Sequence, residues 1–249
     1  MIGNKKDKML HQPLHKKRRK SQREEAEVVD VVFLDIDGVL LPFGGDQSPQ
    51  NNTCTDGCIF PNRTMDALTS LLQQMSELEL PMESSAKANK CALKHYDAPN
   101  LKCNPKLVLS STWRARPNFI EDILSSFRCY AAANPQHRDI WNKHSESFFD
   151  ICDPSFHSTR HQEIYNWIKT QRGTDDDIMQ HKIKASNITG KYVIQSWIAL
   201  DDEEMVDVPD AYPDTDRHAV KTKSSVGLVQ TDVELALMLV KNQIMEASK

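Results

Sequence analysis

An apolar run interrupted by two acids limits most strongly what this chain can fold into. Residues 31–41 read Val-Val-Phe-Leu-Asp-Ile-Asp-Gly-Val-Leu-Leu. Such a run is typical of a strand buried on both faces of a parallel sheet, where an acid has no reason to sit. We therefore expect Asp35 and Asp37 to lie at the C-terminal end of this strand. Ligands of open α/β sheets bind in the crevice at these strand ends, so both carboxylates should face a ligand or a metal ion.

Length and charge distribution favour one α/β domain preceded by a basic tail. A chain of 249 residues is long enough for one such domain with additions. Residues 1–28 hold nine Lys or Arg against four Asp or Glu and few apolar residues, so we interpret them as a disordered tail. The run Lys16–Lys20 is a nuclear import signal, a contact to nucleic acid, or a solvated segment without a partner. The folded domain is then expected over residues 29–249.

The cysteines and the N-terminus predict an intracellular protein that is not secreted, located in the cytoplasm or the nucleus. Six cysteines lack regular spacing, and no apolar leader opens the chain, so reduced thiols are expected. No run approaches the roughly 18 apolar residues of a membrane span, and we expect no membrane partner. A zinc site is a weaker alternative, because the spacing of its candidate ligands fits no strong pattern. These candidates are Cys54, Cys58, Cys91 and Cys103.

Strands alternating with helices predict a three-layer, Rossmann-like, doubly wound parallel sheet. Further apolar strands are expected at 106–109 and 196–200, and helices at 68–78, after Pro117, from Thr159 and at 231–244. Residues 43–105 are interpreted as an irregular loop and helix insertion after the first strand. Such a long connection is usually functional or disordered, so a small cap over the site is one reading of it.

Polar residues also follow the two later strands. Ser110 and Ser111 follow the second strand, and Asp201 and Asp202 follow the third. Four carboxylates converging on one sheet edge raise one another's pKa unless a cation neutralises them. Mg²⁺ prefers carboxylate oxygens and bridges to phosphate, whereas zinc would need Cys or His ligands that these motifs lack. The sequence therefore predicts a magnesium site at this edge.

These motifs resemble those of the haloacid dehalogenase-like (HAD) hydrolase superfamily, in the same order. Phe33–Leu40 resembles its first motif, Leu107–Ser110 its second and Ala199–Asp202 its fourth. More narrowly, Leu-Ser-Ser-Thr-Trp-Arg, the Arg-x-x-Glu-Ile-x-x-Trp pattern from Arg160 and Trp-Ile-Ala-Leu-Asp-Asp are similar to the HAD domain of modular, Swiss-army-knife RNA-repair proteins. The resemblance spans about residues 30–245, without most of residues 43–105, and implies the HAD fold and a phosphatase activity.

The resemblance also implies roles for the acids. Asp35 would attack phosphorus and form an aspartyl phosphate, and Asp37 would act as general acid and then general base. Asp35, Asp201 and the main-chain carbonyl of Asp37 would hold Mg²⁺, while Asp202 would orient that shell.

Other residues are assigned to the phosphoryl group and the substrate. Ser110 would bond a phosphoryl oxygen, and Arg160 would supply the cation that stabilises the transferring group, where the family commonly has lysine. Gly38, Ser111 and Arg114 are predicted to bind substrate. Alternative cations are Lys182, Lys184 and Lys191.

The expected substrate is a phosphate monoester, and the basic tail together with the resemblance favours end phosphates of RNA or DNA. Three alternatives stay open: a phosphatase of small phosphorylated metabolites, a phosphotransferase, and a nucleic-acid-binding or scaffolding protein with a vestigial site. The sequence does not predict the oligomeric state.

Overall fold

Five parallel strands form the centre of the fold in the computed structural model, which describes residues 27–44, 53–78, 103–153, 159–172, 192–205 and 215–247. The strand order is β3-β2-β1-β4-β5. The strands are β1 (Glu27–Leu34), β2 (Pro105–Leu109), β3 (Asp150–Ile151), β4 (Tyr192–Asp201) and β5 (Ala219–Lys221). This confirms the predicted α/β Rossmann-like parallel sheet.

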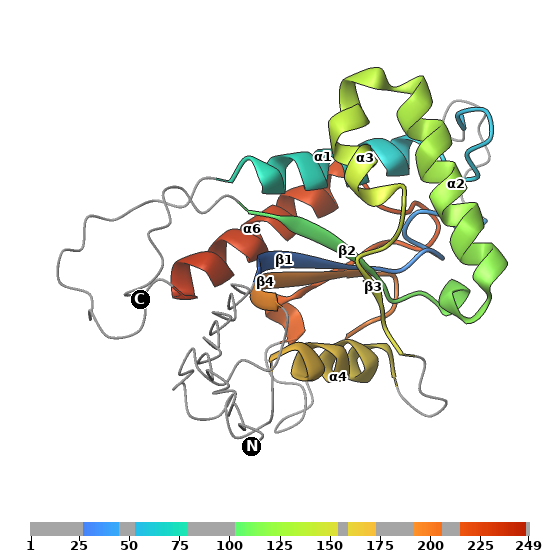
Figure 1. Cartoon of the computed structure of the whole chain (residues 1–249). Coiled ribbons are helices and arrows are strands. Elements are labelled where there is room, and N and C mark those ends of the chain that lie inside the picture. Colours follow the sequence, from blue (N-terminus) through green and yellow to red (C-terminus); the bar gives the residue numbers. More distant parts are fainter. Residues whose placement is uncertain are drawn as a thin grey trace, which may run out of the picture.

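Helices cover both faces of the sheet (Figure 1). One face packs against α1 (Asn62–Ser76), α2 (Pro117–Ala133), α3 (Arg138–His144) and α6 (Gln230–Ala247), and the other against α4 (Arg160–Arg172). No helix in the described part of the chain is both long and apolar enough to cross a membrane. Pro117 opens α2 as expected, since its fixed φ suits a first helical turn.

Strand β1 is the middle strand, and its sequence explains why. Val32 and Leu34 join the core under α1 and α6, while Val31 and Phe33 join the core under α4. All four side chains are fully buried, which only a strand with a helical layer on each face allows. Asp30 is an acid inside this strand, and its carboxylate accepts hydrogen bonds from Ser196 Oγ (2.6 Å) and the Asn104 amide (2.9 Å).

The structure corrects several sequence-based boundaries. β1 begins at Glu27, inside the predicted tail of residues 1–28, the rest of which lies outside the described residues. The predicted insertion at 43–105 contains α1, which packs in the core between α6 and β2 and is therefore not part of a cap. Residues 45–52 and 79–102 of that insertion lie outside the described residues. The short strands β3 and β5 and helix α3 were not predicted.

The five described cysteines are free thiols, as expected. Cys103 lies beside Asp30, whereas Cys58 lies near Cys54 and Cys129, so the predicted alternative of one zinc site does not bring its ligands together. Cys91, the remaining candidate ligand, is outside the described residues.

Candidate active site

The C-terminal ends of β2, β1 and β4 meet at one edge of the sheet. The Asp35 amide donates to the Leu200 carbonyl (3.1 Å), and the Ser110 amide donates to the Leu34 carbonyl (3.0 Å). Asp201 is the last residue of β4. The backbone register therefore places Asp35, Ser110 and Asp201 side by side, as parallel strands with adjacent ends require.

Three of the four predicted acids form a tight cluster. One carboxylate oxygen from each of Asp35, Asp201 and Asp202 lies within 4.8 Å of the others. Asp35 and Asp201 are almost completely buried. Burial raises the pKa of Asp35, and the Asp202 charge adds to this increase. The Arg160 guanidinium and the hydrogen bond from the Ser111 hydroxyl act in the opposite direction and lower the pKa. Burial and the neighbouring Asp35 charge raise the pKa of Asp201 to about 7. The cluster thus carries more negative charge than its surroundings neutralise.

Asp202 reaches this cluster because residue 38 is glycine. Gly38 has a positive φ of +71°, and a Cβ there would lie 2.3 Å from Asp202 Cγ. The Gly38 amide donates to the Leu41 carbonyl (2.8 Å), and its carbonyl accepts from Thr222 Oγ1 (2.9 Å). Both backbone groups make hydrogen bonds within the protein, and the predicted contact of Gly38 with substrate stays a prediction. Its role is to allow the turn and the close approach of Asp202.

The Asp37 carboxylate does not belong to this cluster of three acids. That position is compatible with its predicted role as general acid and base. Its Oδ2 accepts a hydrogen bond from Trp113 Nε1 at 3.0 Å. Trp113 comes from the short 3₁₀ turn Thr112–Ala115 that follows β2. The turn after β2 therefore orients the acid that follows β1.

Arg160 brings a positive charge into the cluster from the start of α4. Its guanidinium lies 3.6 Å from Asp35 Oδ1, 3.3 Å from Asp201 Oδ2 and 3.8 Å from Glu163 Oε2. Its side chain is only 9% exposed. Arg160 thus lies where the sequence placed the cation. The structure does not describe residues 173–191, which contain the alternative cations Lys182, Lys184 and Lys191.

The residues after β2 divide into two kinds. The Ser110 hydroxyl is buried without a hydrogen-bond partner, whereas the Ser111 hydroxyl bonds Asp35 and accepts from the Trp113 amide (3.4 Å). Arg114 is 4% exposed and donates to the carbonyls of Ser110 and Ser111 and to the Glu163 carboxylate. These contacts of Ser111 and Arg114 hold the site together, and the predicted contact of both residues with substrate stays a prediction.

Unpaired buried atoms concentrate in this site. Among the described residues, seven buried side-chain nitrogen or oxygen atoms have no hydrogen-bond partner. They include two acceptors, Asp35 Oδ1 and Asp201 Oδ2, and three donors, Ser110 Oγ and Arg160 Nε and Nη1. The arginine and carboxylate atoms of this set still form the ion pairs given above, at 3.3 to 3.8 Å, whereas Ser110 Oγ has no such contact. Unpaired buried polar groups are costly and usually mark a missing ion or ligand. The acceptors suit a hard divalent cation such as Mg²⁺, and the donors suit an anion.

Three residues that build this site carried no predicted role: Glu163, Trp113 and Thr222. Glu163 follows Arg160 by three residues, a spacing that places both on one face of a helix. The pair is part of the Arg-x-x-Glu-Ile-x-x-Trp pattern, which assigned no role to Glu163. Trp113 was part of the quoted motif, but nothing in the sequence indicated its contact with Asp37. Thr222 follows the unpredicted strand β5.

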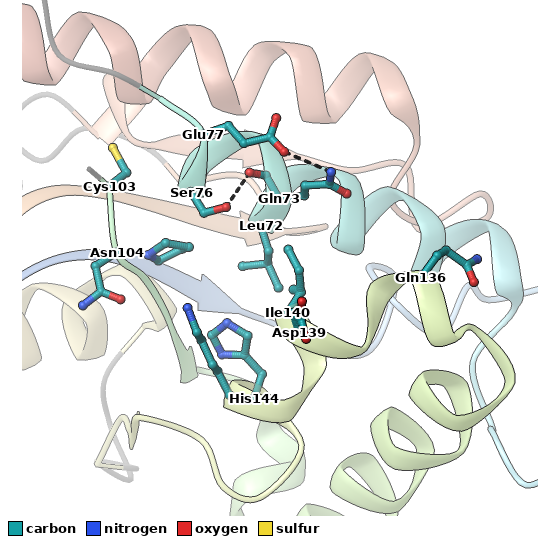
Figure 2. A pocket seen from close by; sticks show the side chains of 12 residues that line it. Leu72, Gln73, Ser76, Glu77, Cys103, Asn104, Gln136, Asp139, Ile140 and His144 are labelled. Atoms are coloured by element: carbon teal, nitrogen blue, oxygen red, sulfur yellow. Dashed lines mark hydrogen bonds between the residues drawn. The ribbon is translucent and has the colours of Figure 1, made fainter. Parts of the chain in front are cut away.

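A second candidate site lies at the opposite end of β2. A cavity of about 300 Å³ opens between α1 and α3 next to Asn104 and Pro105 (Figure 2). Its lining mixes acids such as Glu77 and Asp139 with Lys143 and His144. None of the unpaired buried atoms belongs to its lining. The chemistry therefore points to the acidic cluster.

Comparison with known proteins agrees with this geometry. The family model described as "HAD domain in Swiss Army Knife RNA repair proteins" matches residues 31–233, which covers every site residue above. No curated protein and no solved structure matches the chain significantly.

Proposed function

The chain belongs to the family of HAD domains in Swiss Army Knife RNA repair proteins, and on this premise we propose that it is a Mg²⁺-dependent phosphatase acting through an aspartyl phosphate on Asp35. The family makes the chain a HAD-type hydrolase in general. The magnesium dependence, the covalent intermediate and the substrate are the finer parts of the proposal.

One observation carries the proposal: unpaired acceptors and unpaired donors lie together at the edge of the sheet. Asp35 Oδ1 and Asp201 Oδ2 accept no hydrogen bond and meet the Arg160 guanidinium as ion pairs at 3.6 and 3.3 Å, while the Ser110 hydroxyl makes no hydrogen bond. A phosphate ester bound with a cation would satisfy both sets, because its oxygens accept from the donors and the cation binds the carboxylates.

Asp35, Asp201 and Asp202 fit the proposed Mg²⁺, since their oxygens converge within 4.8 Å. The ion would lower the pKa of the two raised carboxylates and keep Asp35 ionised as a nucleophile. When bound, it would supply charge neutralisation on the phosphoryl oxygens.

In the first step, an Asp35 oxygen attacks phosphorus in line while the bond to the leaving oxygen breaks. Asp37 transfers its proton to that oxygen, so the alcohol leaves neutral. Ser110 and Arg160 donate to the phosphoryl oxygens, where charge accumulates. The hydrogen bond from the Trp113 indole restricts the Asp37 carboxylate, which supports this role.

In the second step, Asp37, now a carboxylate, takes a proton from water as the water oxygen attacks phosphorus. The bond between phosphorus and Asp35 breaks, which releases inorganic phosphate and restores the Asp35 carboxylate. Asp37 is again protonated and ready for the next cycle.

The substrate class proposed is the end phosphate of a polynucleotide. Two features support it: the family is named for RNA repair proteins, and residues 1–28 carry an excess of basic side chains that favours a polyanion.

The mechanism is tested by release of phosphate from an aryl phosphate by the wild type and by Asp35→Asn, with and without Mg²⁺. We expect turnover only by the wild type with the metal. Activity that persists in Asp35→Asn, or after chelation, would exclude the mechanism.

The substrate class needs a separate panel. Oligonucleotides with 3′ or 5′ phosphates are compared with nucleotides and sugar phosphates at equal concentration. We expect higher kcat/KM on the oligonucleotides, decreasing with salt, and removal of residues 1–26, which ends before β1, should reduce this preference. Equal values on all substrates would contradict the polynucleotide assignment.

A further inference from the structure

We propose that Glu163 is a positioning residue that fixes Arg160 for phosphoryl transfer and, through Arg114, links this cation to the phosphate-binding turn after β2. The inference rests on the proposed phosphatase function, which assigns Arg160 and Ser110 to the phosphoryl group. No role for Glu163 follows from the motifs of the acidic cluster.

Glu163 is the carboxylate that stays with Arg160 when the site is occupied. In the structure Arg160 contacts three acids, Asp35, Asp201 and Glu163. The first two belong to the cluster proposed to hold the cation, and Glu163 does not. Once a cation binds the cluster, Glu163 is the described acid left to hold the guanidinium, at 3.8 Å from Nη1.

Glu163 is itself fixed by Arg114. The side chains of Arg114 and Glu163 are 4% and 8% exposed, and they form a direct ion pair. Arg114 also donates to the carbonyls of Ser110 and Ser111. Because a guanidinium has several donors in a rigid plane, one arginine can hold a carboxylate and two carbonyls in a fixed relation.

A continuous chain of polar contacts therefore joins two elements that come from different layers. It runs from the backbone of Ser110 through Arg114 and Glu163 to Arg160, and from there to Asp35. A buried ion pair of this kind adds little net stability, because desolvation offsets the attraction. Its consequence is geometric: the Ser110 hydroxyl and the Arg160 guanidinium keep a constant separation across the phosphate site.

A double-mutant cycle tests this role. Glu163→Gln keeps the shape but removes the charge, and we expect kcat on an aryl phosphate to fall at least tenfold with little change in KM. Arg160→Ala should reduce kcat/KM by about 10²-fold. If Glu163 acts through Arg160, adding Glu163→Gln to Arg160→Ala should change activity less than twofold. Equal losses in both backgrounds would overturn the proposal, because they indicate a merely structural role.

Glu121→Gln is the matched control, since it makes the same change in an exposed ion pair with Arg128 on α2. It should leave kcat and KM unchanged. If Glu163→Gln does not fold, Glu163→Asp is the alternative variant. It keeps the negative charge but shortens the side chain by one methylene, so kcat should fall while KM stays unchanged. Wild-type kcat in Glu163→Asp would overturn the positioning role.

Orthovanadate binding with Mg²⁺, measured by calorimetry, separates failure of this inference from failure of the phosphatase proposal. We expect Glu163→Gln to weaken vanadate binding by at least tenfold, even if the wild type hydrolyses none of the esters tried. Equal vanadate affinity in wild type and Glu163→Gln would refute the role of Glu163, whereas activity persisting in Asp35→Asn refutes only the phosphatase mechanism.

Discussion

Replacing Gly38 with alanine should reduce activity far more than the same change at Gly44, and the structure gives the size of the effect. A Cβ at position 38 would lie 2.3 Å from Asp202 Cγ and Oδ2 and 2.6 Å from Asp202 Cβ. Carbon contacts are favourable only near 3.5 Å, so Asp202 must move by about 1 Å. Rotation of its side chain does not suffice, because its Cβ is also too close. Displacement of about 1 Å costs about 10²-fold in rate.

Gly44→Ala is a matched control for the backbone strain. Gly44 also has a positive φ (+55°), but a Cβ there would meet no atom within 4 Å. Each substitution should cost about 1–2 kcal/mol of unfolding free energy for the left-handed backbone. Urea denaturation should therefore show this loss in both variants, with a larger loss in Gly38→Ala because Asp202 must also move, while kcat/KM with Mg²⁺ falls about 10²-fold in Gly38→Ala alone. Equal kcat/KM in the two variants would refute the argument that Gly38 exists to admit Asp202.

Three further predictions concern single side chains. Ser110→Ala should lower kcat/KM by about 10²-fold. Its unfolding free energy should change by less than about 0.5 kcal/mol, because the Ser110 hydroxyl has no hydrogen bond within the protein to lose. A clearly destabilised variant in urea denaturation would contradict this. Burial and the charges of Lys106 and Lys143 lower the pKa of His144 to about 4, so the protein should lose about 3 kcal/mol of unfolding free energy as the pH falls from 6.5 to 4. His144→Gln should flatten this pH dependence in urea titrations. An equally steep pH dependence in the variant would show that His144 is not its cause. Asp30→Ala leaves two buried donors unpaired and should cost about 2–4 kcal/mol while kcat of the folded enzyme is unchanged; a large loss of kcat would instead indicate a role in the site.

The convergence of Asp35, Asp201 and Asp202 could be predicted because it depends on two local signals. Apolar runs identified the central strands, and the ends of neighbouring parallel strands necessarily meet at one edge. Arg160 followed from the resemblance, which indicated that a cation was needed. The geometry agrees with both, although the catalytic roles themselves stay predictions.

The supporting contacts could not be predicted, since they depend on packing between distant segments. Nothing in the sequence indicates that Arg114 binds Glu163, 49 residues later. The strands β3 and β5 are only two and three residues long, and their pairing with longer neighbours defines them. The helix predicted near Thr231 begins at Gln230, and the Asp232 carboxylate accepts from the Val229 amide, because the preceding turn fixes where the helix can start.

The central position of β1 means that the chain should behave as a split enzyme. A cut between residues 78 and 103 yields a short fragment with β1, Asp35 and Asp37 and a long fragment with the other four strands. In the long fragment β2 and β4 would lose the strand that joins them. Neither piece can assemble a working crevice, so recovered turnover would report directly on reunion of the two halves, for instance when each is fused to one member of an interacting pair.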